Sequence, residues 1–373
     1  MTPDPQPQPM PKYNADNERT KRRYFTYLKE AKRRSEPSLD AAAKALRRFE
    51  VDTGFRSFKA FHREQAVAFK RHLAEQLSER TGKPLSKATV HSTLADLKAF
   101  FVWLAGEPGF RSRLSYSDAD YFNSSERDAR IATTRREARA PSLGLVRQVI
   151  AAMPAADAIQ RRDRAVVAFI LLTGGRDGAV ASLMLKHVDL VEGCVTYDAR
   201  EVKTKFGKSF TTWFIPAVGD DIRTIVDEWV RYLSKDLQWG PEDPLFPATR
   251  VEGGLDKAFR ATGLERRPWA SADPIRQIFR RAFTAAGHPY YPPHRLRDTL
   301  AKLGEKLCRT PEQFKAFSQN MGHTGVLTTF MNYGEVSQAQ QAELIRGLSE
   351  RSAASAEVVE EMAALVAKYQ RAL

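Results

Sequence analysis

The sequence predicts a mainly α-helical protein with one small β-sheet, an α+β fold class, arranged as two domains with tails. Three observations support this prediction. Apolar residues recur at helical spacing through most of the chain. Short runs rich in β-branched and aromatic residues occur between residues 194 and 215. The length of 373 residues also exceeds what one hydrophobic core commonly serves.

The N-terminal part of the chain predicts a disordered tail followed by a helical domain. Residues 1–17 are proline-rich and lack the apolar stretch of a signal peptide. Residues 18–111 form the predicted domain, in which Ser86 begins the last helix. The third helix is expected to bury Ala66, Phe69, Leu73 and Leu77. The four helices are expected at residues 19–34, 38–49, 62–80 and 86–104.

Two further segments are predicted to lie outside the domain cores. Residues 112–140 contain few large aliphatic side chains and carry five arginines between positions 127 and 139. We interpret them as an interdomain linker that either lies against phosphates or is merely solvated. Residues 346–373 predict a C-terminal helix whose apolar face packs on its own domain or contacts another protomer.

The second domain is expected to span residues 141–345, with Ser142 as the N-cap of its first helix. The runs Cys194–Tyr197 and Thr211–Ile215 predict the two strands of a β-hairpin. Its turn region, Lys203–Ser209, is polar and rich in lysine. Further helices are expected near residues 165–172, 222–233, 271–286, 299–307 and 310–320.

Composition narrows the class of partner. The net charge of +14 and the isoelectric point near 9.7 favour a polyanion, with nucleic acid as the leading candidate. A solvated basic surface or an anionic membrane surface are the alternatives. The sequence has no stretch of 18 uninterrupted apolar residues, so it does not predict a membrane span. Cys194 and Cys308 lack CxxC spacing, which argues for a reducing compartment and against structural zinc.

Basic residues suited to phosphate contact cluster in particular segments. Residues 19–34 contain eight Lys or Arg and a single acid, so a helix there has one basic face, with an ordinary solvated surface as the alternative. The candidate DNA-binding residues are Arg22, Arg23, Arg33, Arg34, Lys87, Arg135, Arg136 and Arg139.

Two arginines are placed to bind a phosphodiester. Arg176 follows two glycines after an apolar helix, and glycine permits close approach of the backbone to a ligand. His294 and Arg297 share one helix face at i, i+3 spacing, and the prolines before them fix the helix start. Two guanidiniums clamp the non-bridging oxygens of a phosphate bidentately. Each residue taken alone is more often structural, so the combination carries the hypothesis.

Proton transfer and nucleophilic attack have their own candidates. Tyr333 is a candidate nucleophile if a neighbouring base takes its proton and cations stabilise the oxyanion. Lys203 is placed to protonate a leaving 5′ oxygen, although Lys205 and Lys208 compete for that role. His323 is a further candidate to carry a proton or to donate a hydrogen bond to the phosphate. The sequence lacks a Walker-type loop, HExxH, GxSxG and a carboxylate cluster near these motifs, so it favours neither NTPase nor metal-dependent chemistry.

Taken together, these motifs resemble the ordered set of the tyrosine recombinase (phage integrase) family. The resemblance extends over about residues 20–345, where residues 86–104 are similar to the last helix of the family's core-binding domain. The motifs that carry it are Arg176 in LLTGGR, Lys203 before Thr204, His294-Arg295-Leu296-Arg297, Met321-Gly322-His323 and Tyr333.

The resemblance implies a core-binding domain and a catalytic domain that close around duplex DNA. It implies cleavage by Tyr333 to a 3′-phosphotyrosine, with no metal, ATP or other cofactor, and strand exchange in a homotetramer formed on DNA from monomers. An integrase of a mobile element is the first hypothesis. Alternatives are a chromosome-dimer resolvase, an invertase, or a non-catalytic DNA-binding protein on this fold. Accessory DNA-bending proteins, a location in the bacterial cytoplasm with the nucleoid, and cleavage in cis are further expectations.

The sequence departs from the family pattern in two places. The family usually has an acid three residues after its first arginine, where this chain has Ala179, and Asp177 is a displaced candidate. The spacing from His323 to Tyr333 is one residue longer than is typical. Neither departure removes a catalytic group.

Overall fold

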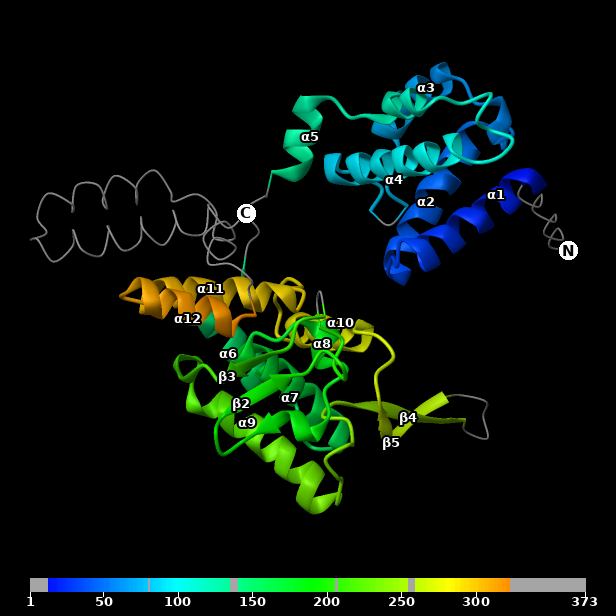
Figure 1. The fold of residues 1–373 in the computed structure, drawn as a ribbon. Helices are drawn as coiled ribbons and strands as arrows, with labels where there is room; N and C mark the ends of the chain where they lie inside the picture. Colours follow the sequence, from blue (N-terminus) through cyan, green and yellow to red (C-terminus); the bar gives the residue numbers. More distant parts are fainter. Residues whose placement is uncertain (1–12, 80, 135–139, 205–206, 254–258, 323–373) are drawn as a thin grey trace, which may run out of the picture. The chain divides into compact units, whose positions relative to one another are not determined.

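The computed structural model describes residues 13–79, 81–134, 140–204, 207–253 and 259–322. The chain divides into two compact units, residues 1–136 and 137–373, which are described separately (Figure 1). No helix in the described ranges is long and apolar enough to cross a membrane.

The first unit is a helical domain. Its helices are α1 (Ala15–Thr26), continued by a π-helical turn (Tyr27–Ala31), α2 (Glu36–Asp52), α3 (Arg63–Glu75), α4 (Lys87–Ala105) and α5 (Glu126–Thr133). Ser86 caps α4 by accepting a hydrogen bond from the Thr89 amide, as the sequence predicted. These helices surround an aromatic core in which Phe101 packs edge-on against Phe49 at 5.5 Å and stacks on Phe122 at 4.9 Å.

One lysine of the basic first helix serves the interior rather than the surface. The Glu50 carboxylate is fully buried, and Lys21 Nζ lies 2.6 Å from its Oε2 while Asn17 Nδ2 donates to its Oε1 at 3.2 Å. A buried carboxylate without such partners is costly, so this network holds α1 against α2. Lys21 therefore contributes to the structure, whereas Arg22, Arg33 and Arg34 remain exposed.

One expectation for this unit is wrong. The third helix ends at Glu75, and Leu77 is 61% exposed because the chain turns there to form a β-bridge with Pro84. Residues 112–134, which belong to the predicted interdomain linker, contain a 3₁₀ helix (Tyr116–Phe122) and α5. Three residues of this segment, Leu114, Ala119 and Phe122, are buried in the core of the first unit, so few apolar residues anchor it.

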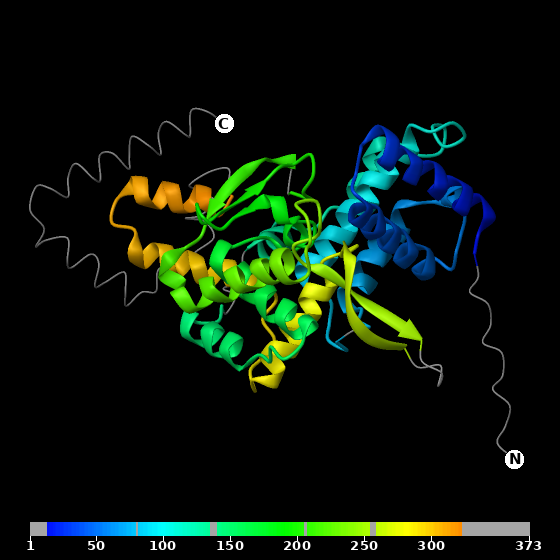
Figure 2. The same ribbon diagram turned by 90° about the horizontal axis from the view of Figure 1, so that it is seen from below.

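The second unit is built around one buried helix, α7 (Ala158–Thr173), whose residues 165–173 are all buried. Figures 1 and 2 show α9, α10 and α11 packed about it, with a small sheet on one side. The helices of the unit are α6 (Leu143–Ala152), α7, α8 (Asp177–Val180), α9 (Asp220–Arg231), α10 (Asp273–Ala285), α11 (His294–Leu307) and α12 (Pro311–Asn320).

The predicted hairpin forms the centre and edge of an antiparallel three-stranded sheet, in the order β1 (Val188–Asp189), β2 (Cys194–Tyr197), β3 (Phe210–Trp213). Cys194 pairs with Trp213 and Tyr197 with Phe210. The register places Tyr197 on the buried face of the sheet, because side chains alternate along a strand. The loop between β2 and β3 carries Lys203 and Thr204.

The expectation of a single sheet is wrong. A second antiparallel hairpin, β4 (Pro247–Gly253) and β5 (Phe259–Pro268), extends away from the helices of its unit (Figure 2). Most of its residues are exposed, so the strands lack the alternation that marks a half-buried strand in sequence. At its base the buried Arg162 donates to the Pro247 carbonyl at 3.0 Å and to Thr249 Oγ1 at 2.9 Å.

Candidate active site

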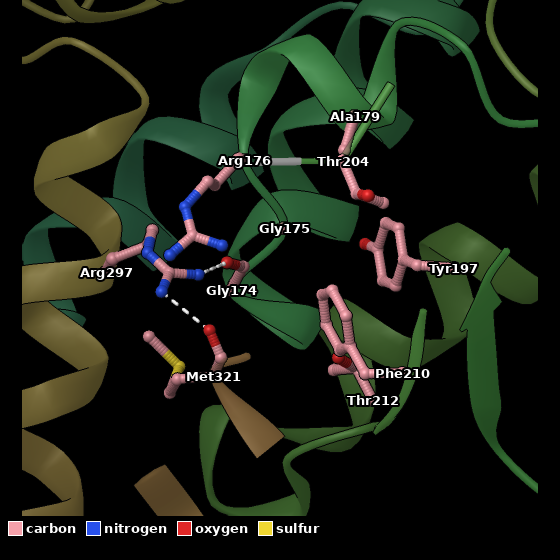
Figure 3. A pocket seen from close by; sticks show the side chains of 10 residues that line it. All are labelled: Gly174, Gly175, Arg176, Ala179, Tyr197, Thr204, Phe210, Thr212, Arg297 and Met321. Atoms are coloured by element: carbon pink, nitrogen blue, oxygen red, sulfur yellow. Dashed lines mark hydrogen bonds between the residues drawn. The ribbon is translucent and has the colours of Figure 1, made fainter. Parts of the chain in front are cut away.

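Arg176 lies directly after the end of α7. The helix ends at Thr173, and its C-cap Gly174 adopts a left-handed conformation with φ of 66°. This backbone angle favours glycine, and a Cβ at this position would lie 2.6 Å from the Met321 sulfur and displace that side chain. The chain then turns into α8 with Arg176 as its N-cap residue, and the Arg176 side chain points into a small pocket (Figure 3).

Arg297 lies one turn into α11, which begins at His294 immediately after Pro293, as the sequence predicted. Its side chain is only 5% exposed and donates to the Gly174 carbonyl and, at 2.6 Å, to the Met321 carbonyl (Figure 3). These bonds connect the end of α7 to the residue that follows α12. Arg297 thereby holds together three segments and shares one pocket with Arg176.

The two arginines differ in how their charges are satisfied. The Arg176 guanidinium has no hydrogen-bond or ion-pair partner within the described ranges, and burial lowers its pKa from the ordinary value of 12.5. An arginine remains protonated even so, because the shift starts from such a high value. A half-buried, unpaired cation beside a second guanidinium is an arrangement that an anion stabilises.

His294 lies close enough to the arginine pair to respond to its charge. Burial lowers the pKa of His294, and the nearby Arg297, Arg295 and Arg176 lower it further, while Asp298 opposes them. The imidazole is therefore neutral near pH 7 and can accept a proton. Arg295 pairs with Asp298 at 2.7 Å and does not line the pocket.

The predicted lysine lies on the loop that follows β2. The Lys203 amide donates to Ser182 Oγ at 3.0 Å, and its exposed side chain reaches towards the Ala270 carbonyl, 3.5 Å from Nζ. Its neighbour Thr204 lines the pocket itself. Lys208 is described and exposed, whereas Lys205 lies outside the described residues, so the three-way choice stays open.

Several pocket residues were not singled out from the sequence. Tyr197 is fully buried there and stacks on Phe210, with ring centroids 4.8 Å apart. The alternation in β2 predicts that Tyr197 faces inward, but it does not predict what the phenol meets. The other residues of the pocket wall outside the arginines are Gly174, Gly175, Ala179, Thr204, Thr212 and Met321.

The pocket has no acidic residue three positions after Arg176. Ala179, at the position where the family that the motifs resemble usually has an acid, lines the pocket. Asp177 does not replace it, because its carboxylate accepts a hydrogen bond from the Gly178 amide and pairs with Arg276 Nε at 2.8 Å. The pocket described here therefore holds two arginines and no carboxylate among its lining residues.

Some predicted residues cannot be placed. His323, Tyr333 and residues 346–373 lie outside the described residues, as do Arg135, Arg136 and Arg139. Of the candidate DNA-binding residues that are described, Arg23 pairs with Glu107 and Lys87 pairs with Asp128 at 2.8 Å. In the parts of the chain that the structure describes, no group of three or more His, Cys, Asp or Glu could hold a metal ion.

No family model and no curated protein matches the sequence. Solved structures match its fold. A lambda integrase dimer bound to a COC′ core site has a TM-score of 0.59 at 14% identity, with 86% of this chain and 96% of that chain covered. The Tn1549 transposon integrase in complex with transposon right end DNA has a TM-score of 0.55 at 13% identity, with 88% and 99% covered. The chain therefore has the fold of these tyrosine recombinases, as its motifs predicted.

Proposed function

We propose that this protein is a site-specific DNA recombinase that cleaves and rejoins duplex DNA through a 3′-phosphotyrosine, and that it serves as the integrase of a mobile genetic element. The observation that carries the proposal is the pocket in which the unpaired Arg176 and the buried Arg297 lie together, on a fold shared with two DNA-bound integrases. A net charge of +14 suits a nucleic-acid substrate.

The chemistry assigns one task to each group. Arg176 and Arg297 bind the non-bridging oxygens of the scissile phosphate and stabilise the charge that develops on them. The Tyr333 oxygen attacks phosphorus while its proton passes to a general base. His294 acts as this base, because its imidazole is neutral near pH 7. The bond from phosphorus to the 5′ oxygen breaks, and Lys203 supplies the proton to that oxygen. His323 donates to the phosphate, and the reverse sequence on a second 5′ hydroxyl rejoins the strand.

This reaction conserves the energy of the phosphodiester in the phosphotyrosine, so the step needs no nucleotide hydrolysis. We further propose that four copies assemble on DNA, that each Tyr333 attacks within its own active site, and that the exposed Arg22, Arg33 and Arg34 contact phosphates. Resolution of chromosome dimers and DNA inversion use the same chemistry, and they are distinguished by the products formed from defined pairs of sites.

The test is covalent trapping on a nicked duplex. Duplexes that bind the protein are selected from a randomised pool, nicked beside the scissile phosphate and incubated with the protein in EDTA. We expect a denaturation-resistant adduct with wild type, none with Tyr333→Phe, and a loss of roughly 100-fold or more with Arg176→Ala. Tight binding without any adduct would support the non-catalytic DNA-binding alternative and overturn the recombinase proposal.

The same assay identifies the lysine. Lys203→Ala, Lys205→Ala and Lys208→Ala are compared on the natural duplex and on one with a 5′-bridging phosphorothiolate, whose thiolate leaves without a general acid. We expect Lys203→Ala to be slow on the natural duplex and to regain wild-type rate on the sulfur substrate. Rescue of a different variant would transfer the role to that lysine.

A further inference from the structure

Two hydroxyl groups in the pocket are buried without a hydrogen-bond partner. Tyr197 Oη and Thr204 Oγ1 are both inaccessible to solvent, and neither has a partner within the described residues. Leaving a buried hydroxyl unpaired costs free energy, so such groups are rare unless a ligand or a functional state uses them. Both belong to the wall of the pocket that holds Arg176 and Arg297.

The Tyr197 phenol is directed at the segment that carries Arg176. A Cβ built on Gly175 would lie 2.8 Å from Tyr197 Oη, so the glycine is what lets the phenol approach this backbone (Figure 3). The neighbouring Thr173 hydroxyl donates its only proton to the Phe169 carbonyl at 2.7 Å and accepts a hydrogen bond from the Gly175 amide at 3.1 Å, so it has no proton to donate to Tyr197 Oη. The Tyr197 oxygen can therefore accept a hydrogen bond from another donor in the pocket.

Thr204 brings the second hydroxyl from a different segment. It follows Lys203 on the β2–β3 loop, and its side chain lies beside Tyr197 in the pocket (Figure 3). The loop is fixed at this point by the Lys203 amide, which donates to Ser182 Oγ at 3.0 Å. The two hydroxyls therefore come from the end of β2 and from the loop beyond it, and they meet at the segment after α7.

The phenol stays neutral despite the neighbouring cations. Complete burial raises the pKa of Tyr197 to about 12, although the charges of Arg297 and Arg176 oppose the rise. A carboxylate in the pocket wall would pair with Arg176 and cancel its charge, but the wall has Ala179 at position 179 instead of an acid. A neutral hydroxyl oxygen accepts a hydrogen bond from a guanidinium and leaves its positive charge available.

We infer that Tyr197 and Thr204 are positioning residues of the reaction proposed above, whose hydroxyls hold the Arg176 guanidinium from the inner side of the pocket when the scissile phosphate occupies its outer side. One N–H edge of Arg176 then faces the hydroxyls and the other faces the phosphate. The two hydroxyls then orient Arg176 as an acid would, but they do not reduce the attraction of its charge for the phosphate. The inference rests on the proposed strand cleavage.

The test separates function from folding with substitutions that keep shape. Tyr197→Phe preserves the ring stacked on Phe210, and Thr204→Val preserves the volume of Thr204. We expect each to slow adduct formation on the nicked duplex roughly 10-fold to 100-fold at saturating DNA. The thermal midpoint should stay the same or rise, because an unpaired buried hydroxyl has been removed. Thr224→Val on α9 and Tyr232→Phe in the π-helical turn that follows it (Tyr232–Asp236) are matched controls expected to cleave at the wild-type rate.

Three outcomes decide the matter. Wild-type cleavage by Tyr197→Phe overturns the inference while leaving the proposed function intact, whereas absence of adduct with wild type contradicts the proposed function itself. Parallel loss of stability and cleavage indicates a merely structural role and overturns the inference. A 5′-bridging phosphorothiolate adds a check, because rescue of Thr204→Val would show that Thr204 acts through Lys203 rather than through Arg176.

Discussion

At the scale of single residues, partners rather than residue type distinguish the arginines of the second unit. Arg162 is 3% exposed and is satisfied by Asp163 and two oxygens of β4, so it serves the structure. Arg297 is nearly as buried but donates to backbone carbonyls of two segments that form the pocket. Arg176 has no partner within the described ranges. This difference in hydrogen-bond partners is why we propose Arg176 as the arginine that binds the ligand.

The lowered pKa of His294 makes a prediction for stability against pH. The folded-state value lies below the ordinary 6.5, so the unfolded chain binds the proton first as the pH falls. Stability is therefore fully present above about pH 6.5 and is lost as the pH falls towards the folded-state pKa. We expect wild type to lose more unfolding free energy between pH 7.5 and pH 5.5 than His294→Gln does.

Urea denaturation followed by tryptophan fluorescence measures this difference. Trp103 is the one tryptophan of the first unit, so Trp103→Phe as the background makes the signal report the second unit. Equal pH dependence in the two proteins would contradict the lowered pKa.

At the scale of elements, burial decides which segments matter for folding. Helix α7 is buried along its C-terminal half and is the element around which the other helices of its unit pack. The β4–β5 hairpin is mostly exposed and joins the body through Arg162 and the Pro247 end of β4. Helix α7 is therefore a core element, whereas the β4–β5 hairpin is a peripheral element attached at its base.

Shortening the hairpin should therefore leave the second unit folded. Thr249 pairs with Leu264, so residues 250–263 can be replaced by Asn-Gly, the preferred two-residue hairpin turn. We expect the thermal midpoint to change by no more than about 2 °C, because changes at exposed sites are usually within about 0.5 kcal/mol. The contrasting variant is Arg162→Ala, which removes the donor to Asp163 Oδ1 and to the Pro247 carbonyl of β4, while Arg281 still pairs with Asp163 Oδ2. Arg162→Ala should destabilise the unit by roughly 2 kcal/mol or more. Calorimetry measures the thermal midpoint of both variants. A larger loss of stability in the shortened hairpin than in Arg162→Ala would show that the hairpin is part of the core.

At the scale of the whole molecule, the excess of 59 basic over 45 acidic residues gives the chain its net charge of +14. Part of this charge is neutralised locally, as in the Lys21–Glu50, Arg23–Glu107 and Lys87–Asp128 pairs of the first unit. The exposed Arg22 and Arg34 have no ion pair within the described residues. Long-range attraction of a polyanion depends on such unpaired charges.

Binding to duplex DNA should depend steeply on salt. We expect the affinity to fall by roughly 1,000-fold between 50 and 200 mM salt, as for proteins that make six or more phosphate contacts. The variants Arg22→Gln and Arg34→Gln should each reduce the slope of log Kd against log salt by about one. Arg71→Gln, an exposed change on α3, is the matched control, and titrations by fluorescence anisotropy provide the slopes. An affinity that hardly changed with salt would exclude phosphate contacts as the main source of binding.

The sequence by itself determined the elements that have a local signature. Helices with continuous apolar stripes, the caps at Ser86 and Ser142, the helix start after Pro293 and the β2–β3 hairpin all follow from short-range patterns. The same patterns failed where burial is atypical: the exposed β4–β5 hairpin carries no alternation, and the segment near Phe122 is anchored by few residues. The motif order indicated which arginines and histidine to consider.

Only the tertiary structure decided how these residues meet. Arg297 and the Gly174 carbonyl are 123 positions apart, and no local pattern states that one donates to the other. The burial of Tyr197 and Thr204 beside Arg176, the capture of Asp177 by Arg276 and the absence of a carboxylate from the pocket wall are likewise consequences of packing. The physical reason is that sequence periodicity reports which face of an element is buried, whereas the partner of that face depends on contacts between segments far apart in the chain.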